Sequence, residues 1–183
     1  MKSSPVQVPG TTWSALQIMQ YSVAATKTDG TLWSWGYAGF GELGQNAALA
    51  AGTRSSPVQI PGTTWGTNEN QIGGGQRDRG VVKTDGTLWM WGRNQFGQCG
   101  QNNQIAYSSP VQVPGTTWST FTMTNYAALA TKTDGTLWSW GYAGLGNLGN
   151  NSVGHRSSPV QIPGTTWSSI GSFNYGGFGI KVT

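Results

Sequence analysis

The sequence predicts an all-β protein built from repeated four-stranded antiparallel sheets. Three observations predict this fold: two strings of residues recur along the chain, turn-forming and aromatic residues are abundant, and charged residues are scarce. Gly accounts for 29 of the 183 residues and Trp for 10, while only 9% of the residues are charged. Short strands joined by tight turns accommodate such a composition, whereas helices need surfaces rich in Ala, Glu, Lys and Leu. We therefore expect almost no helix.

The two recurring strings divide the chain into units. The opening string, Ser-Ser-Pro-Val-Gln-(Val or Ile)-Pro-Gly-Thr-Thr-Trp, starts at Ser3, Ser55, Ser108 and Ser157. The second string, Lys-Thr-Asp-Gly-Thr-Leu-Trp-x-Trp-Gly, starts at Lys27, Lys83 and Lys132. The chain is therefore one repeat domain, with units at approximately 3–54, 55–107 and 108–156 and a partial unit at 157–183.

Each complete unit is expected to form four short strands. In the first unit we place them at 5–8, from Trp13 onwards, at 23–28 and at 31–35. An Asp-Gly pair separates the last two strands and favours a hairpin, because both residues tolerate the positive φ of such turns. Four antiparallel strands in a unit of about 50 residues are typical of a propeller blade. The prediction is a β-propeller with about three and a half blades per chain, either a partial ring or a ring completed by oligomerisation.

A family resemblance rests on the second string and the residues after it. Segment 29–45, Asp-Gly-Thr-Leu-Trp-Ser-Trp-Gly-Tyr-Ala-Gly-Phe-Gly-Glu-Leu-Gly-Gln, resembles the signature of the regulator of chromosome condensation repeat family. The resemblance covers essentially the whole chain and implies a propeller, which is commonly seven-bladed in that family. Its members include a nucleotide-exchange factor for a small GTPase and inhibitors of other proteins. Where many members carry His after the second turn, this chain has Tyr21, Arg77, Tyr126 and Tyr175.

Charge and hydropathy exclude several classes of partner. The net charge of +4 comes from 10 Lys and Arg residues and 6 acids that are spread thinly along the chain. Nucleic-acid binding requires clustered cations, so no nucleic-acid partner is expected. The sequence contains neither a long apolar stretch nor the core of a signal peptide, so we expect no membrane insertion and leave the compartment open.

The titratable residues predict no catalytic, metal or cofactor site. Three of the six acids belong to the Asp-Gly turns, which leaves Glu42, Glu69 and Asp78 with no expected facing pair. His155 is the only histidine, and Cys99 is the only cysteine and cannot form an internal disulfide. Because Cys99 occupies a column of leucines in the repeat, we expect it to be a buried apolar group. The chain is therefore predicted not to be an enzyme.

The tryptophans fall into two kinds of column in the repeat. The paired residues of the second string, such as Trp33 and Trp35, share one face of a strand and are expected to be buried between blades. The column after the Thr-Thr turn is expected to be more exposed, and it is the better candidate for stacking against a sugar. Its members are Trp13, Trp65, Trp118 and Trp167.

The second unit departs from the others. Its column tryptophan, Trp65, lies 18 residues before Lys83, whereas the corresponding separation is 14 in the other units. The extra residues fall in segment 69–79, which contains Gly-Gly-Gly followed by Gln and then Arg77, Asp78 and Arg79. One interpretation is a longer surface hairpin with an internal Arg–Asp pair. The other is a contact loop for an anion or a partner, although it lacks the Lys-Ser/Thr of a phosphate-binding loop.

Incomplete blades predict self-association. The partial fourth unit lacks its Leu-Trp-Ser-Trp strand, and an exposed blade face or strand edge is a template for association. We expect a homo-oligomer, most simply a dimer, with an interface that contains Pro5, Val6, Val8, Phe178, Ile180 and Val182.

The function predicted from the sequence is a non-enzymatic binding or assembly scaffold, such as a viral or bacterial surface or structural protein. The partners expected are a second copy of the chain and a protein or glycan receptor. Two alternatives remain: a lectin-like propeller that uses the exposed tryptophan column, and a module that regulates a GTPase, as the family resemblance implies.

Overall fold

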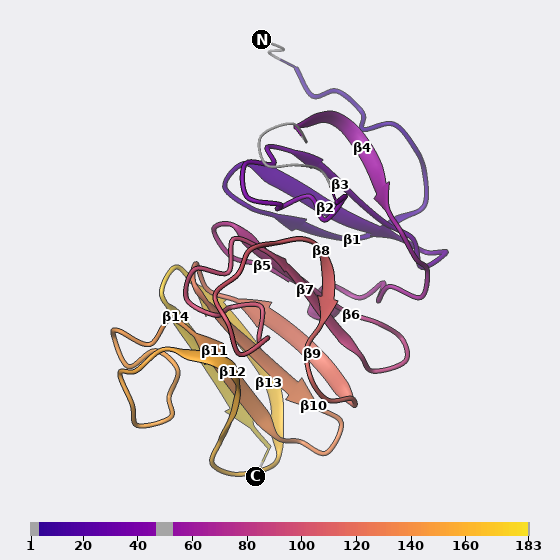
Figure 1. Cartoon of the computed structure of the whole chain (residues 1–183). Helices are drawn as coiled ribbons and strands as arrows, with labels where there is room; N and C mark the ends of the chain where they lie inside the picture. Colours follow the sequence, from indigo (N-terminus) through magenta and orange to yellow (C-terminus); the bar gives the residue numbers. More distant parts are fainter. Residues whose placement is uncertain (1–3, 47–52, 183) are drawn as a thin grey trace.

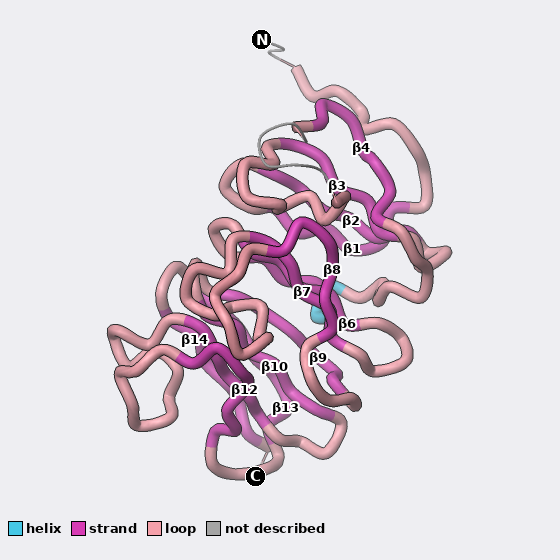
Figure 2. The backbone as a smooth tube through the Cα atoms, in the orientation of Figure 1, coloured by secondary structure: helices cyan, strands magenta, loops and turns pink. Residues whose placement is uncertain are grey.

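The protein is an all-β stack of antiparallel sheets, as the sequence predicts. The computed structural model describes residues 4–46 and 53–182. The sheets succeed one another along the chain like the blades of an open fan, and the ring is not closed (Figure 1). In the described ranges the only helical element is one 3-10 turn, η1 (Glu69–Gln71), drawn in cyan in Figure 2. No helix in these ranges is long and apolar enough to cross a membrane.

Within residues 4–46 and 53–182, three sheets have four strands each, in sequential order, and a fourth has two. The first blade consists of β1 (Trp13–Ile18), β2 (Ser22–Lys27), β3 (Leu32–Gly36) and β4 (Arg54–Ile60). The second consists of β5 (Ile72–Gly74), β6 (Asp78–Val82), β7 (Leu88–Gly92) and β8 (Tyr107–Gln112). The third consists of β9 (Trp118–Met123), β10 (Ala127–Lys132), β11 (Leu137–Gly141) and β12 (Arg156–Ile162). The fourth is a half-blade of β13 (Trp167–Phe173) and β14 (Gly176–Lys181).

Blades and sequence units are out of phase by one strand. The opening string of each later unit forms the outer strand of the preceding blade, so that Leu32 of β3 pairs with Ile60 of β4. The prediction that residues 5–8 form the first strand of the first blade is therefore wrong, and no strand is found among residues 4–12. In the repeat, this string pairs with the third strand of the blade before it, and the described residues contain no blade before β1.

The Asp-Gly hairpins form as predicted and also connect neighbouring blades. Gly30 has a φ of +76°, and the Thr31 N–H donates to Asp29 Oδ1 at 2.9 Å. Hydrogen bonds from the hydroxyl and the N–H of Thr31 hold the pKa of the Asp29 carboxyl below its ordinary value. The Trp65 N–H donates to the Gly30 carbonyl at 3.0 Å, which ties the start of the second blade to the turn of the first. The same hydrogen bonds recur at the turns that contain Asp85 and Asp134.

The inner strands β1, β5, β9 and β13 contact one another in sequence and line the axis of the fan. The extra residues of the second unit form η1, which contacts both β1 and β9, so they lie at this axis and not in a surface hairpin. The glycine run forms most of β5. A Cβ on Gly73 would lie 2.8 Å from the ring of Phe121, and one on Gly74 would lie 2.8 Å from Met19. These glycines therefore permit close packing of neighbouring blades.

Blade faces pack into two apolar cores. Ala15, Ala24, Leu32 and Ile60 of the first blade meet Trp65, Ile72, Val81 and Trp91 of the second. The second core joins the second and third blades and contains Cys99, which is fully buried, as predicted. The second blade therefore packs one face against the first blade and the other against the third.

The prediction that the paired tryptophans are buried is confirmed for Trp91 and Trp140 only. Trp91 and Trp140 are 0% exposed, whereas Trp33, Trp35, Trp89 and Trp138 are half-buried. The buried pair reaches the preceding blade: the Trp91 indole donates to the Glu42 carbonyl at 3.0 Å, and the Trp140 indole donates to the Gln98 carbonyl at 2.6 Å. Trp35 holds the same position in the first blade, where no preceding blade is described to cover it.

Replacing Trp91 by phenylalanine should destabilise the protein more than the same change at Trp35. Trp91→Phe leaves the buried Glu42 carbonyl without its donor and creates a void, so we expect a loss of about 2–4 kcal/mol in the free energy of unfolding. Trp35→Phe should cost less than about 1 kcal/mol, because that indole makes no such bond within the described residues. Urea denaturation measures both values, and equal losses would contradict the role assigned to this bond.

Candidate functional site

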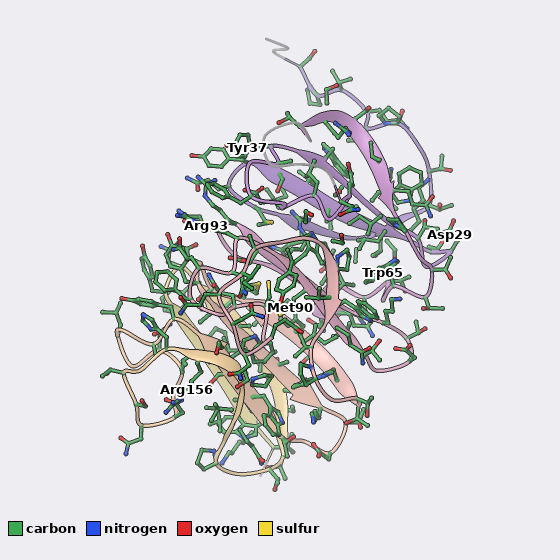
Figure 3. All side chains as sticks on the ribbon, in the orientation of Figure 1. Asp29, Tyr37, Trp65, Met90, Arg93 and Arg156 are labelled. Atoms are coloured by element: carbon green, nitrogen blue, oxygen red, sulfur yellow. The ribbon has the colours of Figure 1, made fainter. Side chains whose placement is uncertain are left out.

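The two ends of the blades differ in chemistry. We call one the arginine end, which comprises residues 19–22, 37–46, 53–54, 75–79, 93–107, 124–127, 142–156 and 174–176. The opposite lysine end comprises 9–13, 27–31, 61–71, 83–87, 114–118, 132–136, 163–167 and 181–182. Figure 3 shows Tyr37, Arg93 and Arg156 on one side of the fan and Asp29 and Trp65 on the other. All five arginines and all six tyrosines of the chain lie at the arginine end.

The lysine end is balanced in charge and repeats from blade to blade. It holds four lysines, at 27, 83, 132 and 181, and four acids, at 29, 69, 85 and 134. Lys83 Nζ lies 4.4 Å from the ring of Trp65 and 4.7 Å from that of Trp89, and the other blades repeat this cation–π contact. Because the arrangement recurs in each blade, it is explained by the architecture of the repeat.

The tryptophan column proposed for sugar binding lies at this lysine end. The prediction that the column is exposed is wrong for Trp65 and Trp118, whose side chains are only 1% and 2% exposed. Each of these indoles packs against both tryptophans on the third strand of its own blade, and Lys Nζ covers it. Trp13 and Trp167 remain half-buried.

Among the described residues of the arginine end, the only exposed charged side chains are positive. Its two acids, Glu42 and Asp78, are 3% and 1% exposed. Tyr21, Tyr37 and Tyr175 are 54%, 43% and 47% exposed. This end therefore presents aromatic rings and guanidinium groups with no carboxylate beside them on the surface.

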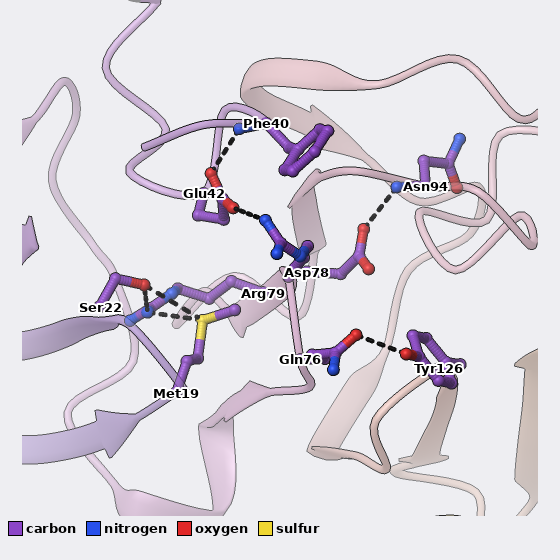
Figure 4. Close-up of polar contacts among 10 residues, drawn as sticks. Met19, Ser22, Phe40, Glu42, Gln76, Asp78, Arg79, Asn94 and Tyr126 are labelled. Carbon is purple, nitrogen blue, oxygen red and sulfur yellow. Dashed lines mark hydrogen bonds and ion pairs between the residues drawn. The ribbon is translucent and has the colours of Figure 1, made fainter. Parts of the chain in front are cut away.

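Arg77, Asp78 and Arg79 do not form the Arg–Asp pair of a surface hairpin, so that interpretation is wrong. Asp78 and Arg79 belong to β6 and are buried, because their strand lies between two other blades. Asp78 accepts hydrogen bonds from the Asn94 N–H at 2.6 Å and from Gln98 Nε2 at 3.1 Å. Arg79 reaches across to the first blade, where its Nη2 donates to Ser22 Oγ at 3.2 Å (Figure 4). Arg77 reaches instead toward Glu42, with 3.6 Å between Nη1 and Oε1.

Burial shifts the ionisation of the two β6 residues. Burial raises the pKa of Asp78 to about 7, and the nearby Glu42 adds to the rise, while the hydrogen bond from Asn94 opposes it. Burial lowers the pKa of Arg79 to about 9. Two of its guanidinium nitrogens, Nε and Nη1, have no hydrogen-bond partner among the described residues. A buried cation with unpartnered donors costs stability and is inaccessible to a ligand, so of the three predicted contact residues only Arg77 reaches the surface.

Phe40 and Phe96 occupy equivalent positions in the repeat but are flanked differently. The guanidinium carbons of Arg77 and Arg93 lie 4.5 Å and 4.8 Å from the ring of Phe40. Phe96 packs instead against the rings of Tyr126 and Tyr142, with centroids 5.3 Å and 5.0 Å apart. The junction of the first and second blades is therefore cationic, and the junction of the second and third is aromatic.

Two hollows open at the arginine end. The first, of about 380 Å³, is lined by Tyr21, Tyr37 and Arg77. The second, of about 480 Å³, lies at the axis of the fan. Its polar lining includes the side chains of Gln17, Gln20, Gln76, Asn125 and Asn174. Sequence reasoning identified the tyrosine column but assigned it no site. The signal available was that, apart from Arg79 in β6, tyrosine and arginine fall within or at the end of the same two kinds of loop in each unit.

Residues 4–46 and 53–182 contain no candidate metal-binding cluster. No three His, Cys, Asp or Glu side chains gather there in a way that could hold a metal ion. His155 accepts a hydrogen bond from the Ala143 N–H through Nδ1 at 3.1 Å and packs on Tyr142, with 4.8 Å between ring centroids.

Four-stranded antiparallel sheets fanned around inner strands make this chain an open β-propeller of repeated blades. Residues 85–123 match the family model of the regulator of chromosome condensation (RCC1) repeat. The ultraviolet-B receptor UVR8 of Arabidopsis thaliana is 33% identical over 84 residues, which cover 46% of this chain and 18% of the receptor. Residues 85–123 are thus similar to a repeat of the regulator of chromosome condensation family, and this match supports the resemblance found in the sequence.

Solved structures show the same fold. Prp20p from Saccharomyces cerevisiae superposes with a TM-score of 0.78 at 17% identity, over 94% of this chain and 44% of Prp20p. Yeast RCC1 (Prp20) bound to Kap60 gives 0.80 at 17% identity, over 99% of this chain and 45% of that protein. Human WBSCR16 gives 0.54 at 15% identity, over all of this chain and 60% of that protein. The chain thus spans less than half the length of Prp20p and of UVR8.

Stability should fall as pH rises through the range in which Asp78 titrates. Between the ordinary value of 3.8 and the folded value of about 7, the folded state retains a proton that the unfolded state has lost. The free energy of unfolding should therefore decrease from pH 5 to pH 8 by up to a few kcal/mol, since one pKa unit corresponds to about 1.4 kcal/mol.

Asp78→Asn should remove most of this slope, and Glu69→Gln, an exposed acid at the other end, should leave it intact. Thermal unfolding followed by circular dichroism across this pH range makes the comparison. An unchanged slope in Asp78→Asn would show that another group is responsible.

Proposed function

We propose that this chain is a non-enzymatic interaction scaffold that binds a partner protein through the tyrosine and arginine side chains of the arginine end. The observation that carries the proposal is the confinement of both residue types to that one end. Tyrosine and arginine are enriched at protein interfaces and among the residues that dominate binding energy. The family supports the same class of function, since Prp20p has binding properties toward Gsp1p and histones.

Several side chains of this end are held in place by the structure itself. Tyr126 donates its hydroxyl to the side chain of Gln76 across the blade junction. Arg77 lies over the ring of Phe40. Side chains that are already positioned lose less conformational entropy on binding, which favours affinity.

The competing functions have weaker support. Trp65 and Trp118 are buried, so a glycan could reach only the half-buried Trp13 and Trp167 in that column. Glu42 and Asp78 are buried in hydrogen-bonded or ionic contacts and do not face each other across an open cleft. The lysine end holds as many acids as lysines, so it offers a nucleic acid no continuous row of cations.

The double variant Tyr21→Ala/Tyr37→Ala should lose partner proteins that the wild type captures, because it removes two exposed rings from the arginine end. The control, Thr63→Ala/Thr116→Ala, changes two exposed residues at the lysine end and should retain them. Quantitative mass spectrometry of proteins captured from an extract of the source organism compares the three baits. Identical captured sets for all three baits, or none, would count against the proposed function.

Regulation of a GTPase is a narrower form of this proposal, favoured by the likeness of the fold to Prp20p. If the captured partner is a small GTPase, the chain should accelerate release of a fluorescent guanine nucleotide from it, and Tyr21→Ala/Tyr37→Ala should reduce the acceleration. A GTPase that binds without any change in release would be a partner and not a substrate for exchange.

We also propose self-association through blade faces. The face of the first blade that lacks a described neighbour exposes Leu16 and Ile18 at 53% and 65% and borders an apolar pocket of about 220 Å³ that includes Val8 and Trp35. The corresponding free face of the half-blade exposes Phe173, Phe178 and Ile180 at 66%, 53% and 53%. These are the two kinds of face that pack together inside the chain. We therefore propose that a second copy of the chain stacks face to face on these two surfaces. Edge pairing of residues 5–8 with β14 fits less well. In the repeat, the opening string to which residues 5–8 belong pairs with the third strand of a blade, whereas β14 is a second strand.

Light scattering coupled to size-exclusion chromatography should show a dimer or larger oligomer of this chain. Leu16→Asp should shift it toward the monomer, because a charge on a packed apolar face is costly. Leu145→Asp, at a residue that is 70% exposed in a loop of the arginine end, should not. A folded monomer in the wild type would contradict the proposed self-association without bearing on partner binding at the arginine end.

A further inference from the structure

We infer that the recess lined by Tyr21, Tyr37 and Arg77 binds a carboxylate side chain from an acidic peptide segment of a partner protein. The inference rests on the proposed function, because it names the chemistry of the partner at the arginine end. The recess opens at the junction of the first and second blades and has a volume of about 380 Å³.

Arg77 is anchored on one side and accessible on the other. Its guanidinium carbon lies 4.5 Å from the ring of Phe40 and 5.8 Å from that of Tyr21. Nη1 is buried and faces Glu42 Oε1 at 3.6 Å, which is longer than a hydrogen bond, while the side chain as a whole is 22% exposed. A guanidinium presents five N–H donors in a planar fork, so fixing Nη1 leaves donors for a carboxylate in the recess.

The carboxylate of Glu42 does not neutralise this junction. Arg79 is close enough for Glu42 to raise its pKa against the effect of burial, and Arg93 shares the ring of Phe40 with Arg77. Three guanidinium groups therefore gather around Glu42 and Asp78, and burial disfavours the charged form of Asp78. The junction has a net positive charge that a carboxylate from outside would compensate.

The two tyrosines form the other wall of the recess. Their ring centroids are 6.0 Å apart in an edge-on arrangement, and both rings are largely exposed. Their hydroxyl groups are hydrogen-bond donors for a carboxylate, and the rings offer apolar contact to the rest of a peptide.

The next blade junction serves as an internal comparison. There Tyr126 takes the position of Arg77, Tyr142 takes that of Arg93, and both pack on Phe96. The hydroxyl of Tyr126 already donates to Gln76. The arginine is thus a departure from the tyrosine found in this column in the other three units, and the architecture of the blade does not require it.

An acidic peptide fits this recess better than a nucleic acid does. A phosphate backbone needs a row of cations, whereas Arg54 and Arg156 lie at the starts of the outer strands of the first and third blades. A single carboxylate needs one planar donor fork, which Arg77 supplies.

The probe is a fluorescein-labelled hexaglutamate peptide, followed by fluorescence anisotropy at low ionic strength. It should bind the wild-type chain, and a hexaglutamine peptide should not. Arg77→Gln should weaken binding at least about tenfold, as expected for the loss of a charge-assisted hydrogen bond. Arg77→Lys, which keeps the charge without the fork, should lie between the two. Arg156→Gln removes the same charge from an exposed site of the same end and should change binding less than about twofold.

Three results would overturn the inference. They are no binding of hexaglutamate, an equal loss in Arg77→Gln and Arg156→Gln, or an oligothymidylate that binds more tightly than hexaglutamate through Arg77. Thermal unfolding of Arg77→Gln checks that the variant is folded, and Arg77→Lys provides the comparison if it is not. If one of these results overturns the inference while Tyr21→Ala/Tyr37→Ala still loses captured proteins, the arginine end binds a partner of different chemistry. The proposed function then stands.

Discussion

The stacking of one blade on the next is the constraint on which the rest of this structure depends. A single four-stranded blade has two apolar faces and cannot bury both by itself. The junctions solve this with paired apolar surfaces and with hydrogen bonds between blades, among them those from the buried indoles of Trp91 and Trp140 to the carbonyls of Glu42 and Gln98. Because those carbonyls belong to the loops between third and fourth strands, each junction also fixes the loop that forms part of the arginine end.

This coupling explains how a nearly exact repeat can hold a local site. The blades fix the positions of the loops, and substitutions within the loops alter chemistry without altering the frame. At the second junction Phe96 is packed by tyrosines, and at the first the same position is flanked by Arg77 and Arg93. The buried Arg79 beside them is costly for the fold. The first junction is therefore the place where the repeat departs most from uniform apolar packing.

Much of the fold could be predicted from the sequence because its determinants are local. The Asp-Gly turn needs only Asp29, Gly30 and Thr31 to form, and these residues recur in register. The recurring string that follows this turn marks β3 in the same way, without reference to distant parts of the chain. The phase of the blade could not be found in this way, because the pairing of β4 with β3 joins residues on either side of a long loop.

The candidate site was harder to predict, since it depends on which faces meet. Trp65 and Trp33 belong to different columns of the repeat, but nothing in their spacing distinguishes the more buried column, and only the packed blades bury Trp65 beneath Lys83. Likewise the adjacent residues Arg77, Asp78 and Arg79 suggest a pair, although successive residues of a strand point to opposite faces. The sequence by itself determined the repeat, the hairpins and the all-β class, because these depend on neighbouring residues. Only the tertiary structure decided which arginine reaches solvent, because burial is set by the blade on either side.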